Sequence, residues 1–318
     1  MSQESAMTRL AGAAATSAVN IWPGLSRKDS FVEDAATAAI LARVIDFVMA
    51  GVCVNLSGPA GLGKTTLALR AAEEIGRPVS FMTGNQWLTT RDFIGREVGQ
   101  TERTVVDRYV QSVRRTESES RADWKSAILA TSMLRGYTLV YDEFTRASPE
   151  ANAALLSVIE EGVLVATDRA SDRSYITAHP DFRIILTSNP HDYAGVKTVP
   201  DAMMDRVVTF RLDEPPLERL AEIVALRTGL DPETSTRISR AVLGLRAADA
   251  GGQRGVSTLR TAIMIAKVVV HRIRTGTLTE ADLVTIVQDV VAGRGLPTDP
   301  AQIAALLAPE KPLMETRR

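Results

Sequence analysis

Short apolar runs alternate with helical patterns along the first part of the chain. Five runs are rich in β-branched or aromatic residues and are too short for buried helices, which is typical of strands. They begin at Val52, Val79, Tyr137, Phe182 and Val207. Helical segments lie between them, and one has Ser148 as its cap, Pro149 at its first position and Gly162 at its end. The alternation predicts an α/β fold with a five-stranded parallel sheet covered on both faces.

The pattern changes after Asp213. Helical periodicity then recurs in four segments, and no strand candidate lies among them, which predicts a separate all-α domain. We therefore expect an arm over residues 1–27, an αβα core over 28–213, a helical lid over 214–295 and a tail over 296–318. The arm fits either a flexible segment or a short helix that binds a partner.

Composition narrows the class of protein. The chain has 318 residues, with 37 basic and 38 acidic ones and a net charge of −1, so its overall charge does not favour nucleic-acid binding. Its single cysteine, Cys53, lies in an apolar run and predicts a buried thiol. An intrachain disulfide is thereby excluded, which fits a reducing cytoplasm. No apolar run approaches the ~20 residues that a membrane span needs.

The stretch GPAGLGKT, residues 58–65, follows the first predicted strand and precedes a helix. It matches G-x-x-x-x-G-K-[S/T], in which glycines let backbone N–H groups surround a polyphosphate. Lys64 can reach the β- and γ-phosphates, and the Thr65 hydroxyl can bind Mg²⁺. A chance match in a glycine-rich turn is the alternative, which this context disfavours. The predicted nucleotide-binding residues here are Gly58, Pro59, Ala60, Gly61, Leu62, Gly63, Lys64, Thr65 and Thr66.

Polar side chains follow two later strands. Asp142 and Glu143 end the run YTLVYDEF, where the first carboxylate can hold a metal and the second can activate water. Asn189 follows the strand FRIILTS, and its amide can position the attacking water. An exposed acidic pair and a turn before Pro190 are the competing interpretations. The position of these residues at strand ends favours a catalytic site.

Two arginines complete the candidate site. Arg206 precedes the last predicted strand, from which its guanidinium could reach the nucleotide of a neighbouring subunit. Arg260 lies near the start of a helix in the α-domain and could reach the γ-phosphate. Ordinary surface arginines are the alternative for both, and the placement of Arg260 is the weaker argument.

These motifs together resemble those of a known family. GPAGLGKT, LVYDEF, LTSNP, MMDR and STLR are similar to the Walker A, Walker B, sensor 1, arginine finger and sensor 2 motifs of the AAA+ ATPases, in the same order. DEFTRASPEANAALLSVIEEG resembles the MoxR branch, which usually has asparagine where this chain has Thr145. YDEFTRASPEANAALLSVIEEG, TSNPHDYAGV and VVDRYVQSVRRTE resemble the gas vesicle protein family GvpN.

The resemblance implies a cytoplasmic ATPase that binds ATP and Mg²⁺ and helps to form or enlarge gas vesicles. It implies an AAA+ core and lid, and a homo-oligomeric ring of six subunits in which Arg206 acts on a neighbour. Gas vesicle proteins would be the clients or co-factors, and the ATPase would associate with the vesicles. Neither a specific nucleic acid nor a membrane span is expected.

The segment between the second and third predicted strands is the least ordinary. We expect a helix packed on the sheet, with an apolar face that comprises Val105, Val106, Tyr109, Val110 and Val113. The charged stretch TESESRADWK is expected to be a solvated connection. Trp87 fits either a contact with a client protein or a core position.

Other functions share part of these motifs. A GTPase would need a guanine-reading N-K-x-D element, which does not follow the phosphate loop. A DNA-acting AAA+ enzyme shares every motif, but the balanced charge argues against it. A scaffold that binds ATP and scarcely hydrolyses it is disfavoured by Glu143 and Asn189. A MoxR-type chaperone for metal-enzyme maturation is the nearest alternative.

Overall fold

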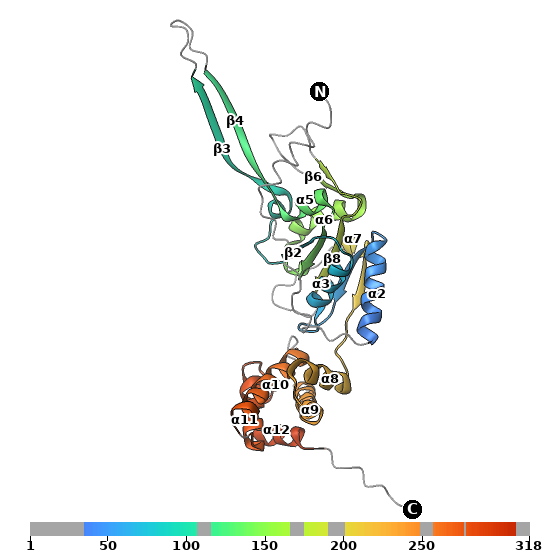
Figure 1. Cartoon of the computed structure of the whole chain (residues 1–318), viewed down its shortest axis with the longest axis vertical. Helices are drawn as coiled ribbons and strands as arrows, with labels where there is room; N and C mark the ends of the chain where they lie inside the picture. Colours follow the sequence, from blue (N-terminus) through green and yellow to red (C-terminus); the bar gives the residue numbers. More distant parts are fainter. Residues whose placement is uncertain are drawn as a thin grey trace, which may run out of the picture.

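The computed structural model describes residues 35–106, 116–165, 175–189, 201–248, 257–276 and 278–309, and for residues 94–106 and 116–126 it describes the backbone alone. A parallel sheet flanked by helices forms one body, and a group of helices lies below it in Figure 1. Among the described helices, none combines the length and the apolar character that crossing a membrane requires.

The central sheet has five parallel strands in the order β2-β5-β8-β1-β9. All five strands predicted from the apolar runs are confirmed. They are β1 (Cys53–Ser57), β2 (Val79–Thr83), β5 (Thr138–Asp142), β8 (Arg183–Ser188) and β9 (Val207–Arg211).

Each strand buries alternate residues on opposite faces of the sheet, as a period of two requires. Leu139 and Tyr141 pack in one apolar cluster, whereas Val140 between them packs in the other. The first cluster lies beneath α4 (Thr90–Ile94), α5 (Ile128–Arg135) and α6 (Pro149–Glu161). The second lies beneath α2 (Ala35–Met49) and α3 (Lys64–Glu74). The expected αβα layering is therefore confirmed.

Local signals in the sequence fix several element ends. The Ser148 hydroxyl accepts a hydrogen bond from the Ala151 amide, and Gly162 ends α6 with a left-handed φ of 66°. A short 3₁₀ helix, η2 (Phe144–Arg146), joins β5 to α6. Cys53 is buried as predicted, and burial raises the pKa of its thiol to about 12.

The last part of the described chain is entirely helical. It comprises α8 (Leu217–Thr228), α9 (Pro232–Ala248), α10 (Thr258–Thr275), α11 (Glu280–Ala292) and α12 (Pro300–Leu307). These helices, called the lid below, share one apolar core of their own. Helix α12 falls in the segment expected to be the tail, and its Ile303 and Leu307 are buried in the lid core.

Two antiparallel hairpins lie outside the central sheet. The long hairpin of β3 (Gly95–Val106) and β4 (Thr116–Ser126) projects from the body in Figure 1. The helix expected to include Val105 and Val106 is therefore wrong at those two residues, because both pair with β4. The other three residues of that expected face lie outside the described residues. The stretch expected to be a solvated connection, residues 116–125, lies instead within β4, so this expectation is also wrong.

The shorter hairpin consists of β6 (Val163–Val165) and β7 (Tyr175–Thr177), between α6 and β8. A four-residue helix, α7 (Asp201–Met204), precedes β9. Trp87 lies in the loop after β2 and is 79% exposed, so a core position is excluded. The contact with a client protein stays a prediction.

Candidate functional site

The glycine-rich loop runs from the end of β1 into the first turn of α3. Gly61 and Gly63 both have φ of +82°, in the left-handed region that favours glycine. At Gly61 a Cβ atom would also lie 2.1 Å from the Ser257 hydroxyl oxygen, which immediately precedes α10 of the lid. The loop therefore needs glycine at this position for both backbone conformation and space.

Lys64 begins α3 and its side chain is directed back over the loop. It is only 7% exposed, and its ammonium donates hydrogen bonds to the carbonyl oxygens of Gly58 and Pro59 over 2.8 and 2.7 Å. A buried ammonium needs such acceptors, because losing water costs free energy. The lysine is thus held within the loop, where it can exchange carbonyl partners for phosphate oxygens.

Asp142 at the end of β5 joins the loop to the sheet. Its Oδ1 atom accepts hydrogen bonds from the Thr65 hydroxyl over 2.7 Å and from the Thr187 hydroxyl over 2.5 Å. A threonine hydroxyl beside a carboxylate is an oxygen set that suits Mg²⁺. Thr65 and Asp142, the residues predicted to hold the metal, are therefore side by side and fit it.

Glu143 is the next residue and has an unusual backbone. Its φ is +52°, the one positive value among the described non-glycine residues. Its N–H donates to the Thr187 hydroxyl over 2.9 Å. Its carboxylate Oε2 lies 3.0 Å from Nε of Arg146, which ends η2. The backbone turn thus points the Glu143 side chain away from the strand axis, toward Arg146.

A pocket of about 650 Å³ lies between the glycine-rich loop, the two acidic residues and the lid. It is called the phosphate pocket below. Its described lining brings together nine predicted site residues: Ala60, Gly61, Gly63, Lys64, Thr65, Thr66, Asp142, Glu143 and Arg260. Five basic residues line it against two acidic ones, which favours an anionic ligand. The basic residues are Lys64, Arg146, Arg227, Arg260 and Lys267.

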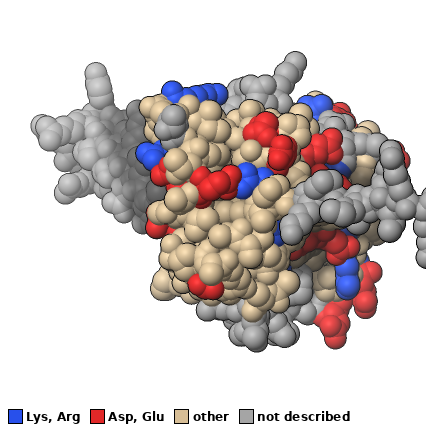
Figure 2. Space-filling view, turned by 90° about the horizontal axis from the view of Figure 1, so that it is seen from below, with Lys and Arg blue, Asp and Glu red and all other residues tan. Residues whose placement is uncertain are grey.

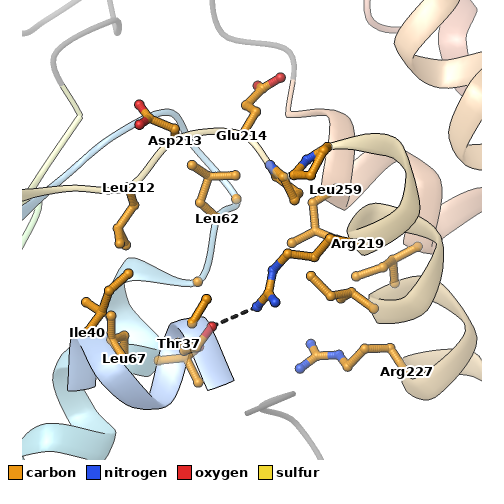
Figure 3. Close-up of a pocket in the computed structure, with 18 of the residues that line it drawn as sticks. Thr37, Ile40, Leu62, Leu67, Leu212, Asp213, Glu214, Arg219, Arg227 and Leu259 are labelled. Carbon is orange, nitrogen blue, oxygen red and sulfur yellow. Dashed lines mark hydrogen bonds between the residues drawn. The ribbon is translucent and has the colours of Figure 1, made fainter. Parts of the chain in front are cut away.

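A second hollow of about 380 Å³ adjoins the first and shares five lining residues with it: Gly61, Gly63, Thr66, Arg227 and Ile263. Figure 3 shows its lining, which is largely apolar and includes Ile40 of α2 and Leu259 of α10. In the same view Arg219 extends from α8 to the Thr37 hydroxyl, over 2.8 Å. An apolar hollow beside a cationic one can hold a ligand that has a flat ring and a charged tail.

Asn189 lies at the same edge of the sheet as the loop. It is buried and directly follows Ser188, which pairs with Ser57 in the sheet. The Gly58 amide donates to the Ser188 carbonyl over 3.4 Å, which ties the two strand ends together. Asn189 is not among the described residues that line the phosphate pocket.

Arg206 also lies outside the described lining of the phosphate pocket. Its guanidinium donates to Glu160 Oε1 of α6 over 2.8 Å and to the Ala202 carbonyl of α7 over 2.7 Å. The hydrogen bond with Glu160 raises the pKa of Arg206 above its ordinary value. Within one subunit, then, the structure does not bring Arg206 together with the other candidate residues.

Arg260 is in the first turn of α10, and its amide donates to the capping Ser257 hydroxyl over 3.1 Å. Its side chain lines the phosphate pocket from the lid side. The close approach of Gly61 to Ser257 explains this placement, because it sets the start of α10 against the loop. This placement is consistent with the prediction that Arg260 could reach the γ-phosphate.

The sequence interpretation missed four polar residues that contact or line the site: Arg146, Thr187, Arg227 and Lys267. Arg146 carried one local signal, since it lies three residues after Glu143. Thr187 lies two residues before Asn189, and residues at i and i+2 share a face of a strand. Arg227 and Lys267 carried no signal, because their approach depends on how the lid folds back.

Residues 54–207 match the family model described as an AAA domain of the dynein-related subfamily. A RuvB variant from Thermotoga maritima superposes with a TM-score of 0.50 at 18% identity, covering 86% of this chain and 74% of that one. At this identity the likeness concerns the fold alone. It agrees with an AAA+ α/β core followed by helices.

Two relatives carry the description "Gas vesicle ATPase GvpN". The one from Ancylobacter aquaticus is 39% identical over 241 residues, which are 76% of this chain and 67% of the relative. The one from Haloferax mediterranei is 38% identical over 223 residues, which are 70% of this chain and 64% of the relative. The chain thus spans about two thirds of the length of these relatives. On this identity and coverage, the chain belongs to the family of gas vesicle ATPases GvpN.

Proposed function

We propose that this protein hydrolyses ATP with Mg²⁺ and uses the cycle to remodel protein partners during gas vesicle formation or enlargement. The observation that carries the proposal is the contact between Thr65 and Asp142 at the edge of a cationic pocket of about 650 Å³. Nucleotide binding follows from family membership and from this pocket. The gas vesicle role rests on what the two relatives are called.

In this proposal, the nucleotide lies with its base in the apolar hollow and its phosphates in the phosphate pocket. Thr65 and Asp142 would hold Mg²⁺, which would supply charge neutralisation at the phosphates. Lys64 binds the β- and γ-phosphates, and Arg260 closes over them from the lid. The main-chain N–H groups of residues 60–66 would bind the phosphates at the start of α3.

Hydrolysis requires a base and a positioned water. Glu143 accepts the proton of the attacking water, and Asn189 orients that water with its amide. Asn189 would have to reach the water from beyond the present lining of the pocket. Charge that develops in the transition state is stabilised by Lys64 and by an arginine of a neighbouring subunit.

That neighbouring residue is Arg206 in our proposal. Its position outside its own subunit's pocket supports action on another subunit, and the family expectation is a ring of six. We further propose the part boundaries 1–27, 28–213, 214–295 and 296–318, where the last part contains α12, which packs in the lid core. In this proposal the lid, α12 included, moves against the core as ATP is consumed. A cytoplasmic location at the gas vesicle belongs to the same proposal.

The charge on the lid-end face bears on the DNA-acting alternative. Figure 2 shows acidic side chains spread over this face, with basic ones between them and no continuous basic patch among the described residues. Such a surface gives little electrostatic attraction to a phosphate backbone. A gel-shift titration with duplex DNA is expected to show no complex at physiological salt, and a tight complex would favour the DNA-acting alternative.

A pull-down tests the partner assignment. Full-length protein carrying E143Q, loaded with ATP and Mg²⁺, is expected to retain gas vesicle shell proteins, whereas the nucleotide-free protein retains few. Binding to a metal-enzyme partner instead would favour the MoxR-type chaperone. Measurable turnover by the wild type distinguishes both from a scaffold that binds ATP and does not hydrolyse it.

A further inference from the structure

Arg146 is a basic residue of the phosphate pocket to which the proposed function gives no role. Its Nε atom lies 3.0 Å from Oε2 of Glu143, the proposed base. Glu143 directly precedes a single turn of 3₁₀ helix and Arg146 ends it, and positions i and i+3 of such a turn lie one above the other. Both side chains line the phosphate pocket.

Contacts of the main chain alone hold the backbone conformation of Glu143. Its N–H is bound by the Thr187 hydroxyl, and its carbonyl oxygen accepts from the Arg146 amide over 3.0 Å. A Cβ atom at Gly84 would lie 2.2 Å from that carbonyl oxygen, so the loop after β2 also packs tightly against it. The positive φ of Glu143 is thus held on several sides, as is typical of strained residues in functional sites.

What remains free is rotation about the side-chain bonds of Glu143. The contact with Arg146 engages one carboxylate oxygen, Oε2, which restricts the orientation of the carboxylate. The other oxygen, Oε1, is then the one that can accept a proton from a water in the pocket. Orientation of this kind matters for rate, because proton transfer requires hydrogen-bond geometry between base and water.

An ordinary surface ion pair is the competing explanation. The Glu143 and Arg146 side chains are 34% and 45% exposed, and pairs this exposed add little to stability. The pair formed by Arg70 and Glu74 on α3 has similar exposures, 39% and 37%, and neither residue lines the phosphate pocket. It provides a matched control for loss of an exposed ion pair as such.

We propose that Arg146 is a positioning residue that holds the Glu143 carboxylate in the orientation needed to activate water. The proposal rests on the proposed function, since it presupposes that Glu143 is the base. It predicts that Arg146 acts on kcat through Glu143 and contributes little to ATP binding.

The test uses the full chain and the variants R146Q, R146K, R70Q, E143Q and the double variant E143Q/R146Q. R146Q is expected to lower kcat by about tenfold or more, because a misdirected catalytic group loses rate steeply. The KM and the Kd for ATP are expected to stay within about twofold. R146K is expected to recover part of kcat, and R70Q is expected to match the wild type.

Single-turnover rates of the double variant give the decisive readout. If Arg146 acts through Glu143, adding R146Q to E143Q lowers the residual rate no further. An additional tenfold fall in the double variant would overturn the proposal, as would unchanged kcat in R146Q or a tenfold rise in its Kd for ATP. R146M is measured in parallel, and thermal unfolding is recorded for both variants. These measurements show whether a loss of kcat in R146Q comes from a disturbed 3₁₀ turn.

Failure of this inference is distinguishable from failure of the proposed function. If E143Q loses turnover while R146Q keeps the wild-type kcat, the role of Arg146 is wrong and the role of Glu143 stands. If E143Q turns over ATP as fast as the wild type, the proposed base itself is wrong, and the role of Arg146 falls with it.

Discussion

The Thr187 hydroxyl bonds to both acidic residues of the site: it donates to Asp142 Oδ1 over 2.5 Å and accepts from the Glu143 amide over 2.9 Å. Thr187 is fully buried on β8, next to β5 in the sheet. One side chain on the neighbouring strand therefore fixes the proposed metal-binding carboxylate and the backbone of the proposed base.

Replacing Thr187 with valine tests this arrangement, because valine keeps the shape and removes the hydroxyl. T187V leaves the Glu143 amide without this acceptor, which costs about 1–3 kcal/mol of unfolding free energy for a buried group. We expect lower kcat and a higher Mg²⁺ concentration for half-maximal activity. T187S keeps the hydroxyl and is expected to retain most activity, and an equal loss in T187S would assign the effect to packing instead.

Removal of the Lys64 ammonium is expected to weaken ATP binding at least tenfold. Its bonds to the Gly58 and Pro59 carbonyls hold it over the loop, where a polyphosphate would bind. Titration of K64A with a fluorescent ATP analogue measures this, and the matched variant E143Q should bind as the wild type does. Unchanged affinity in K64A would show that the phosphates bind elsewhere.

Substitution of Gly61 separates crowding from backbone strain. Gly61 and Gly76 have φ of +82° and +77°, but a new Cβ meets the Ser257 hydroxyl oxygen at 2.1 Å only at Gly61, and it meets open space at Gly76. G76A therefore loses about 1 kcal/mol of stability from φ alone. G61A is expected to lose the same stability. Its affinity for ATP is expected to fall several-fold in addition, because the start of α10 must shift. If G61A and G76A have equal effects in thermal unfolding and in ATP titration, the contact between Gly61 and the lid has no role.

Mixing of inactive variants tests the action of Arg206 between subunits. R206A and K64A are each expected to be inactive, but a mixture is expected to regain part of the activity. A ring that contains both can place an intact Lys64 site beside an intact Arg206 from a K64A subunit. Full activity in R206A alone, or no recovery in mixtures that co-assemble by size-exclusion chromatography, would contradict the proposed role.

The central sheet could be predicted from sequence because its strands are continuous apolar runs bounded by helical patterns. The strand ends also located Asp142 and Asn189, since parallel strands share one carboxyl edge. The β3 and β4 hairpin could not be predicted, because Val105 and Val106 fit a helical face and they become strand residues only through their pairing with residues 116–117.

The missed site residues show the same limit at the level of side chains. Thr187 forms hydrogen bonds with Asp142 and Glu143 because β8 lies beside β5 in the sheet. This strand order cannot be read from the sequence. Arg227 reaches the phosphate pocket only because the lid lies against the loop at Gly61 and Ser257. Such contacts depend on tertiary structure. The spacing of Thr187 from Asn189 indicates a shared face at most, and for Arg227 neither composition nor spacing carries a signal.

Single-turnover hydrolysis of bound ATP by wild type and E143Q shows whether Glu143 is the base of an ATPase site. With Mg²⁺ present, we expect both proteins to bind ATP with similar affinity. We expect the wild type to release phosphate at least a hundredfold faster than E143Q, since a general base contributes about 10²–10⁴-fold. Equal rates of phosphate release from the two proteins would show that Glu143 is not the base and that the proposed site does not hydrolyse ATP as described.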